Sequence, residues 1–160
     1  MIPKYLESNF KIINKKTDGY NNIMEGVLIC CDSQEFEVIY NGNIKKNFFS
    51  KAYLFSENRI ILEAKCKKCG KIIHIFDNYI DGYDQIKNKT NVQLPLTFFN
   101  CGKCSNNNYS LTIKYEYPMV QELKELKLKN IDNAFTWIWV SIKCNNCHTK
   151  YKNFINYETG

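Results

Sequence analysis

The chain has 160 residues, 44% of them hydrophobic and 14% aromatic, which is enough apolar material for a folded core and excludes a disordered chain. Its net charge is +6, but Arg59 is the only arginine among 22 basic residues, and lysine lacks the two-pronged hydrogen bonding with which arginine reads guanine or clamps phosphate. No run approaches the roughly 18 apolar residues of a membrane span, and the first residues lack the charged-then-apolar order of a secretory signal, so we expect a cytoplasmic protein without membrane association.

The first half of the chain contains strand-like segments after a polar start. Residues 1–22 are polar and basic, and we interpret them as an N-terminal extension. Strands are predicted at residues 23–30 and 35–40, and the alternation of apolar and polar side chains is clearest in the second of these. Residues 59–65 lead as a strand into the first Cys-x-x-Cys turn, and residues 71–76 lead out of it.

The second half repeats this scheme and adds one helix. The polar, turn-rich residues 81–91 are expected to connect the two halves. Apolar positions recur at helical spacing from about residue 119 to residue 129, which predicts a short amphipathic helix. Four strands are predicted in this half, at residues 94–100, 109–117, 134–143 and 151–157. The predicted fold class is therefore mainly β with one short helix.

Eight cysteines carry the clearest chemical signal. Six of them form Cys-x-x-Cys turns between strand-like segments, and the other two are adjacent. Two thiols at the Cys-x-x-Cys spacing converge readily on one metal ion, and in a reducing cytosol the pattern favours metal over disulfides. The predicted metal ligands are Cys30, Cys31, Cys66, Cys69, Cys101, Cys104, Cys144 and Cys147.

The Cys-x-x-Cys turns resemble the knuckles of zinc-ribbon and rubredoxin-like domains, and Cys66-Lys-Lys-Cys69-Gly70 is closest to their pattern. The resemblance covers the knuckles and their flanking strands, and it departs at Ser105 and His148, where the usual glycine is missing. It implies tandem zinc-ribbon-like antiparallel hairpins with one or two Zn²⁺ ions per chain. A closed site of four thiolates leaves no coordination position for a substrate, so the resemblance implies a structural metal and no activity.

The distance from each cysteine cluster to the strand that follows takes two values. It is five residues after Cys31 and Cys104, and four residues after Cys69 and Cys147. The two types alternate along the chain, which suggests two tandem copies of one unit. The proposed units cover residues 23–80 and 92–160.

This repeat favours one pairing of the clusters and leaves a second open. In the favoured pairing, knuckles 101–104 and 144–147 share one metal ion, and knuckle 66–69 pairs with the adjacent cysteines 30–31. In the cluster at residues 30–31, Leu28 stands at the position where a Cys-x-x-Cys knuckle would have its first cysteine. Either Cys30 replaces that ligand with a shifted geometry, or this metal site has decayed. The competing pairing joins 66–69 to 101–104 and leaves 144–147 to 30–31.

Few other polar residues suggest chemistry. His148 follows a predicted ligand and could replace a weak one or hydrogen-bond to it, whereas His74 is expected to be a half-buried strand residue. Asp77, Asp81 and Asp84 are interpreted as parts of a solvated turn rather than as a carboxylate site. The sequence has no glycine-rich phosphate loop, nucleophile elbow or His-Glu metalloenzyme motif, so we do not expect an enzyme.

Trp137 and Trp139 lie two residues apart and therefore share one face of their strand. Aromatic rings on a sheet with lysines around them can stack the bases of single-stranded nucleic acid. We favour the other interpretation, in which the aromatic rings fill the core of a small protein. The other aromatic residues considered with the two tryptophans are Phe98, Tyr109, Tyr115 and Tyr117.

The leading functional hypothesis is a cytosolic, zinc-stabilised binding module that acts through protein–protein interaction. It rests on the predicted closed metal sites, the missing catalytic motifs and the many aromatic residues. One alternative is a nucleic-acid-binding zinc ribbon that uses Trp137, Trp139 and Lys143. The other alternative is a thiol redox sensor or a rubredoxin-like electron carrier, because tetrahedral thiolate sites accept iron as well as zinc.

Overall fold

Antiparallel strands account for most of the chain in the computed structural model, which describes residues 1–46, 52–55, 59–83, 95–125 and 130–159. This confirms the predicted fold class, mainly β with one short α-helix. The helical elements are η1 (Lys4–Asn9), α1 (Val120–Glu125) and η2 (Ile131–Asn133), of which η1 and η2 are 3-10 helices. The predicted helix at 119–129 is thus present over its first half, and residues 126–129 lie outside the described residues.

Among the described residues, nine strands form one sheet and two more form a small separate sheet. The large sheet contains β1 (Phe10–Thr17), β2 (Asn21–Leu28), β3 (Phe36–Asn41), β6 (Ile61–Cys66), β7 (Ile72–Asp77), β8 (Thr97–Phe98), β9 (Tyr109–Pro118), β10 (Trp137–Cys144) and β11 (Lys150–Glu158). The small sheet pairs β4 (Asn43–Lys46) with β5 (Ala52–Phe55). Residues 1–22, which we interpreted as an extension, form η1, β1 and the beginning of β2.

Two three-strand meanders with the same pairing pattern make up the centre of the fold. Strand β6 pairs with β3 and β7, and β10 pairs with β9 and β11, all antiparallel. Phe36 lies opposite Cys66 in the first meander, and Tyr109 lies opposite Cys144 in the second. In both meanders, therefore, an aromatic residue at the start of the first strand pairs with the first knuckle cysteine, at the end of the second strand.

The two cysteine hairpins also share their register. Ala64 pairs with Ile73 in the β6–β7 hairpin, and Ile142 pairs with Tyr151 in the β10–β11 hairpin. Ile73 and Tyr151 each follow the second cysteine of their knuckle by four residues. Both ladders of backbone pairing are also interrupted by a register shift, at a point further from the knuckle. The offsets that suggested a tandem repeat thus correspond to equivalent positions in the two hairpins. The boundaries proposed for the units stay a prediction.

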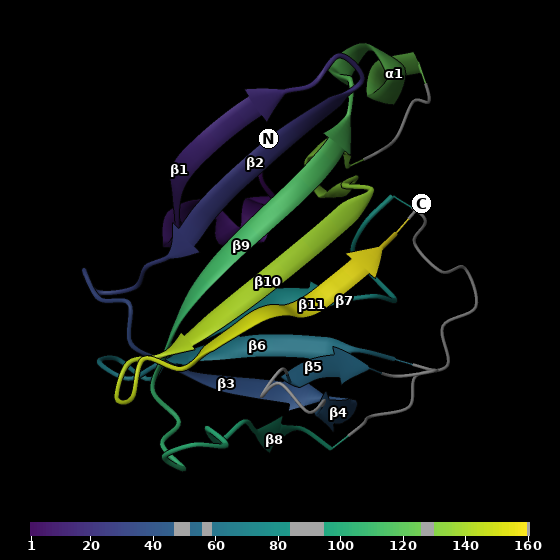
Figure 1. The fold of residues 1–160 in the computed structure, drawn as a ribbon. Coiled ribbons are helices and arrows are strands. Elements are labelled where there is room, and N and C mark those ends of the chain that lie inside the picture. Colours follow the sequence, from purple (N-terminus) through teal and green to yellow (C-terminus); the bar gives the residue numbers. More distant parts are fainter. Residues whose placement is uncertain (47–51, 56–58, 84–94, 126–129, 160) are drawn as a thin grey trace.

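The two meanders are hydrogen-bonded to each other. The strand that precedes each meander in the chain pairs with the first strand of the other meander, and we call this the exchange of leading strands. Phe36 and Tyr109 pair with each other where β3 meets β9. Strand β2, which precedes the first cysteine pair, pairs with β9, and β8, which precedes the third cluster, pairs with β3. In Figure 1, β1, β2, β9, β10 and β11 lie side by side, β7 is partly behind β11, and β6 and β3 lie below this layer at an angle to it. The sheet thereby folds over onto its own apolar side chains.

The core lies between these layers and is rich in aromatic rings. Tyr109, Tyr115 and Tyr117 alternate along β9 and are at most 1% exposed, so the core-filling interpretation is confirmed for them. The Phe99 ring packs against the ring of Phe154 with centroids 4.8 Å apart. Phe98, on the neighbouring position of the short β8 strand, is 47% exposed, and for this ring the interpretation is wrong. Adjacent strand residues point to opposite faces, which explains the difference.

A buried polar cluster lies at the end of β7, where we predicted a solvated turn. The prediction is wrong for Asp77 and Asp81, which are 3% and 2% exposed, because each carboxylate has a basic side chain as its partner. The guanidinium of Arg59 pairs with Asp77, and Nε2 of His74 lies 2.6 Å from Oδ2 of Asp81. Burial disfavours the charged His74 ring, but Asp81 outweighs this and raises the pKa of His74. His74 is half-buried in β7, as predicted, and Asp84 lies outside the described residues.

Candidate metal centres

The three Cys-x-x-Cys knuckles share one backbone geometry. In each, the N–H of the first cysteine donates to the carbonyl five residues later, and the N–H four residues later donates back to the cysteine carbonyl, at 2.8–2.9 Å. These two bonds close the turn and leave both cysteine side chains on the same side of it. The donor and acceptor residues besides the cysteines are Gly70 and Lys71, Ser105 and Asn106, and His148 and Thr149.

The residue after the second cysteine adopts the left-handed conformation in all three knuckles. Its φ is +75° at Gly70, +58° at Ser105 and +61° at His148. The missing glycines that separate the last two knuckles from the zinc-ribbon pattern therefore do not change the turn. They add strain, because the left-handed region costs an L-residue about 1–2 kcal/mol.

This strain gives a testable prediction. We expect His148→Gly to raise the free energy of unfolding by about 1 kcal/mol, because glycine adopts this φ without strain. Gly70→Ala is the matched control. It should lower the free energy of unfolding by about the same amount, because alanine is strained at this φ. No heavy atom lies within 4 Å of the added Cβ, so a steric clash does not contribute. Urea unfolding of the two variants and the parent chain measures both changes in the free energy of unfolding. Equal stability of Gly70→Ala and the parent chain would contradict the argument.

The cluster formed by Cys101, Cys104, Cys144 and Cys147 joins two of the knuckles. The Sγ atoms of Cys101 and Cys147 lie 3.6 Å apart, as do those of Cys104 and Cys144. The edge of a tetrahedron around Zn²⁺ is about 3.8 Å when the Zn–S distance is about 2.3 Å. A disulfide would bring two sulfurs to about 2.05 Å, so the observed spacing fits four ligands of one metal ion and not a disulfide.

Two hydroxyl groups contact the sulfurs of this cluster. The Tyr151 hydroxyl accepts a 2.9 Å hydrogen bond from the N–H of Gly102 and lies 3.3 Å from Sγ of Cys101, to which it can donate. Burial raises the pKa of Cys101, but the Tyr151 hydrogen bond and backbone N–H groups outweigh it, so the pKa is lowered. Thr149 Oγ1 lies 3.1 Å from Sγ of Cys147 and lowers the pKa of that thiol to about 6. These contacts stabilise the thiolates that a metal requires.

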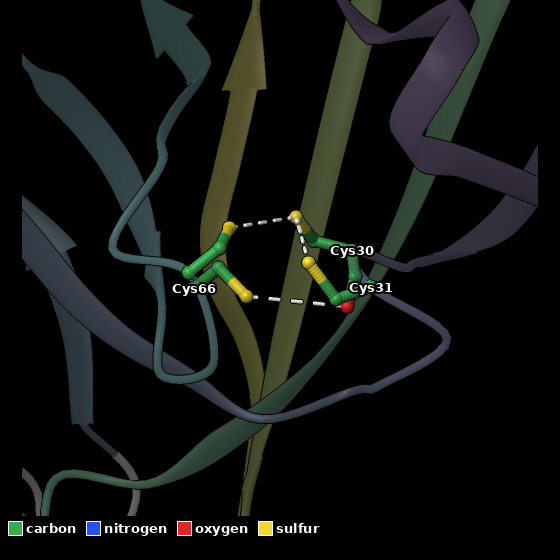
Figure 2. Close-up of side chains that lie close together, drawn as sticks. Cys30, Cys31 and Cys66 are labelled. Atoms are coloured by element: carbon green, nitrogen blue, oxygen red, sulfur yellow. Dashed lines mark hydrogen bonds between the residues drawn. The ribbon is translucent and has the colours of Figure 1, made fainter.

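The second cluster is formed by Cys30, Cys31, Cys66 and Cys69. Cys30 and Ser33 exchange two backbone hydrogen bonds of 3.0 Å, and the two residues between them have φ near +55°. This tight turn lets neighbouring residues present their thiols to one point, and Figure 2 shows Cys30 and Cys31 facing Cys66 across the gap between their segments. Sγ of Cys30 lies 3.8 Å from that of Cys31 and 3.6 Å from that of Cys69.

The structure therefore brings the cysteines together in the pairing that the repeat favoured. Within each group of four, all sulfurs lie within 4.8 Å of one another. Leu28, which stands in the place of a ligand, is buried in the core, and the adjacent pair supplies both sulfurs with the shifted geometry. All eight cysteines are free thiols. Either group could hold a metal ion.

Neither histidine joins these groups among the described residues. His148 occupies the left-handed position of its knuckle and is exposed. His74 lies beside Asp81 and stacks edge-on against the ring of Tyr5, with centroids 4.8 Å apart. The His74–Asp81 contact had no signal in the sequence, because the two residues are seven positions apart and both a strand and a turn lie between them.

Trp137 and Trp139 share one face of β10, as predicted, but it is the outer face. Residues at even positions of this strand are buried and the tryptophans are half-buried, so the core-filling interpretation is wrong for them. Their rings are stacked, with centroids 5.3 Å apart and planes 6° from parallel. Nζ of Lys114 lies over the Trp139 ring, 4.2 Å from its centroid. Lys143 is on the same face, toward the knuckle.

Comparison of the chain with family models, with curated proteins and with solved structures gave no match. In the part of the chain that the structure describes, no helix is long and apolar enough to cross a membrane.

Proposed function

We propose that this protein is a zinc-stabilised binding module of the cytoplasm, with two structural Zn²⁺ ions and a protein partner. The observation that carries the proposal is the presence of two groups of four sulfurs at the spacing of a thiolate tetrahedron. Four thiolates fill the coordination sphere of zinc, which leaves no position for water or substrate. Free thiols at all eight positions are in keeping with a reducing compartment.

The position of the clusters supports a structural role. One would tie the end of β2 to the β6–β7 hairpin, and the other would tie the segment before β9 to the β10–β11 hairpin. The ligands in each group come from segments more than 30 residues apart in the chain. A metal ion that joins such distant segments offsets the loss of chain entropy on folding, because the unfolded chain has no comparable site.

Elemental analysis of the purified protein tests the metal proposal. We expect two zinc atoms per chain and no visible absorption band. Iron in place of zinc would support the electron-carrier alternative, and a folded protein without metal would refute the proposal.

The half-buried tryptophan pair on the outer face of β10 supports a protein partner. Tryptophan is the residue most often found at the energetic centre of protein interfaces, where a polar rim surrounds it. Trp137 and Trp139 have such a rim, since Lys114 and Glu116 lie opposite them on β9. The Trp139 ring already contacts a tryptophan ring and a cation, so little of its surface is left for stacking a base.

Two measurements separate the partner classes. A photo-crosslinking residue in place of Ser141, on the same face of β10, is expected to capture one protein in cells. The purified pair should then bind, and Trp139→Ala should weaken binding at least about tenfold, whereas Tyr20→Ala, at an 84% exposed position on the β1–β2 turn, should not. Quenching of tryptophan fluorescence by single-stranded oligonucleotides at low salt would instead favour the nucleic-acid alternative.

A further inference from the structure

The two cysteine clusters occupy equivalent places in the fold but differ in how their sulfurs are protected. We propose that the cluster of Cys30, Cys31, Cys66 and Cys69 is an exchange site, which gives up its Zn²⁺ to an anionic thiol ligand while the other cluster keeps its ion. The proposal rests on the proposed function, because both clusters must first hold zinc. For brevity, the exchange site is called site 1, and the cluster of Cys101, Cys104, Cys144 and Cys147 is called site 2.

Access is the first difference. Cys31 and Cys69 of site 1 are exposed, whereas two sulfur ligands of site 2 are buried and the other two are of intermediate exposure. An incoming ligand must reach the metal before a bound thiolate leaves, so an exposed edge of the coordination sphere speeds exchange. Site 1 offers such an edge through its two exposed cysteines.

Hydrogen bonding is the second difference. In site 2, Tyr151 and Thr149 place hydroxyl groups 3.3 and 3.1 Å from ligand sulfurs. The shared register of the two hairpins puts Ile73 at the position of Tyr151 and Lys71 at the position of Thr149. Isoleucine cannot donate a hydrogen bond, and Lys71 reaches the Cys69 sulfur with its backbone N–H alone, because its ammonium binds Oδ1 of Asn9 at 2.9 Å. Loss of one such partner of a ligand typically weakens metal binding 10- to 100-fold.

The backbone turns that carry the ligand cysteines are the third difference. Site 1 takes two ligands from one tight turn, in which Cys31 and Asp32 both have positive φ without being glycine. Site 2 takes its four ligands from two regular knuckles, each with a single residue in that conformation. Each site thus contains two strained non-glycine residues, Cys31 and Asp32 in one and Ser105 and His148 in the other, so the sites differ in the shape of their ligand turns and not in the amount of backbone strain.

Charge indicates the chemistry of the competing ligand. Three lysines surround the 66–69 knuckle: Lys67, Lys68 and Lys71 are all exposed, and Nζ of Lys68 lies 3.2 Å from the carbonyl oxygen of Cys31. These three ammonium groups outnumber the carboxylates of Asp32 and Glu35 beside them, and the excess of positive charge attracts an anionic ligand to the exposed edge of the site. In the exchange, incoming thiolates replace Cys31 and Cys69 on the metal first and Cys30 and Cys66 afterwards, so the ion leaves bound to the competing thiolates. Each displaced cysteine thiolate takes up the proton that an incoming thiol loses when it binds the metal.

Zinc-release kinetics on the full, zinc-loaded chain test the proposal, with reduced glutathione as the competing thiol and a colorimetric indicator for free zinc. We expect two phases of one equivalent each, the first at least about tenfold faster than the second. Alkylation followed by mass spectrometry should find Cys31 and Cys69 modified during the fast phase. Tyr151→Phe should accelerate the slow phase and leave the fast phase unchanged, and Cys31→Ser should remove the fast phase.

The outcomes separate this proposal from the one on which it rests. Release of both ions in a single phase, or earlier alkylation of Cys104 and Cys147, would overturn the exchange site and leave two structural zinc ions in place. A purified chain without zinc would refute the proposed function itself. Equal release rates with glutathione and with an uncharged thiol such as mercaptoethanol, at matched thiolate concentration, would overturn the role of the lysines.

Discussion

Cys104→Ser is expected to empty site 2 of metal and to abolish cooperative folding. The serine hydroxyl is a far weaker ligand than a thiolate at neutral pH, so only three sulfurs remain at the site. The free energy of binding structural zinc is about 10–16 kcal/mol, which is as large as the whole stability of a typical domain. The site joins the start of β9 to the β10–β11 hairpin, so its loss separates the strands that make up the front layer.

Zinc content and far-ultraviolet circular dichroism measure this effect. Ser105→Ala, at the neighbouring position of the same turn, is the matched control, because it removes a hydroxyl without touching a ligand and should keep two zinc atoms. Cys31→Ser should be milder, with one zinc lost and cooperative unfolding retained, since Cys31 is exposed and lies in the site that we propose to release its metal more readily. Wild-type zinc content and unfolding in Cys104→Ser would show that Cys104 is not a ligand.

The local features of this fold could be predicted from the sequence because their signals are local. Strand alternation and the Cys-x-x-Cys turns depend on residues a few positions apart. The number of residues between each cluster and the next strand, five or four, also predicted a non-local feature. It indicated that Ile73 and Tyr151 are equivalent, and they do occupy the same register position in the two hairpins. That equivalence also selected the pairing of the clusters that the structure contains.

The exchange of leading strands could not be predicted in the same way. Nothing in residues 21–28 states that they pair with β9, which lies more than 80 residues later, rather than with a neighbour in the chain. The outer position of Trp137 and Trp139 did have a signal. Ser141 and Lys143 follow at the same spacing, whereas the intervening residues are aliphatic, so the tryptophans belong to the polar face of β10.

The buried polar cluster was missed because composition alone describes Asp77 and Asp81 as turn residues. Their burial depends on partners supplied from elsewhere: Arg59 before β6 for the first, and His74 on β7 for the second. The single arginine of the chain is thus used inside the fold rather than on a phosphate-binding surface. This removes the residue best suited to nucleic-acid recognition from the candidates.

Arg59→Met is expected to lower the free energy of unfolding by about 3 kcal/mol, because it leaves the Asp77 carboxylate buried without its counter-charge. The carboxylate is 4% exposed and accepts a bifurcated hydrogen bond from Nε and another from Nη2 of Arg59, besides one from the N–H of Tyr79. Methionine keeps much of the side-chain volume, so the change reports mainly on charge and hydrogen bonding.

Lys65→Met is the matched control, since it breaks an ion pair of a different kind. Nζ of Lys65 lies 3.7 Å from Oε2 of Glu37, and the two side chains are 39% and 22% exposed. Water screens such a pair, so its loss should cost less than about 1 kcal/mol. Urea unfolding of the two zinc-loaded variants compares them directly, with zinc content checked first. Equal destabilisation by the two substitutions would mean that burial of Asp77 carries no penalty, and Arg59→Met combined with Asp77→Asn should recover part of the loss if the unpaired charge is its cause.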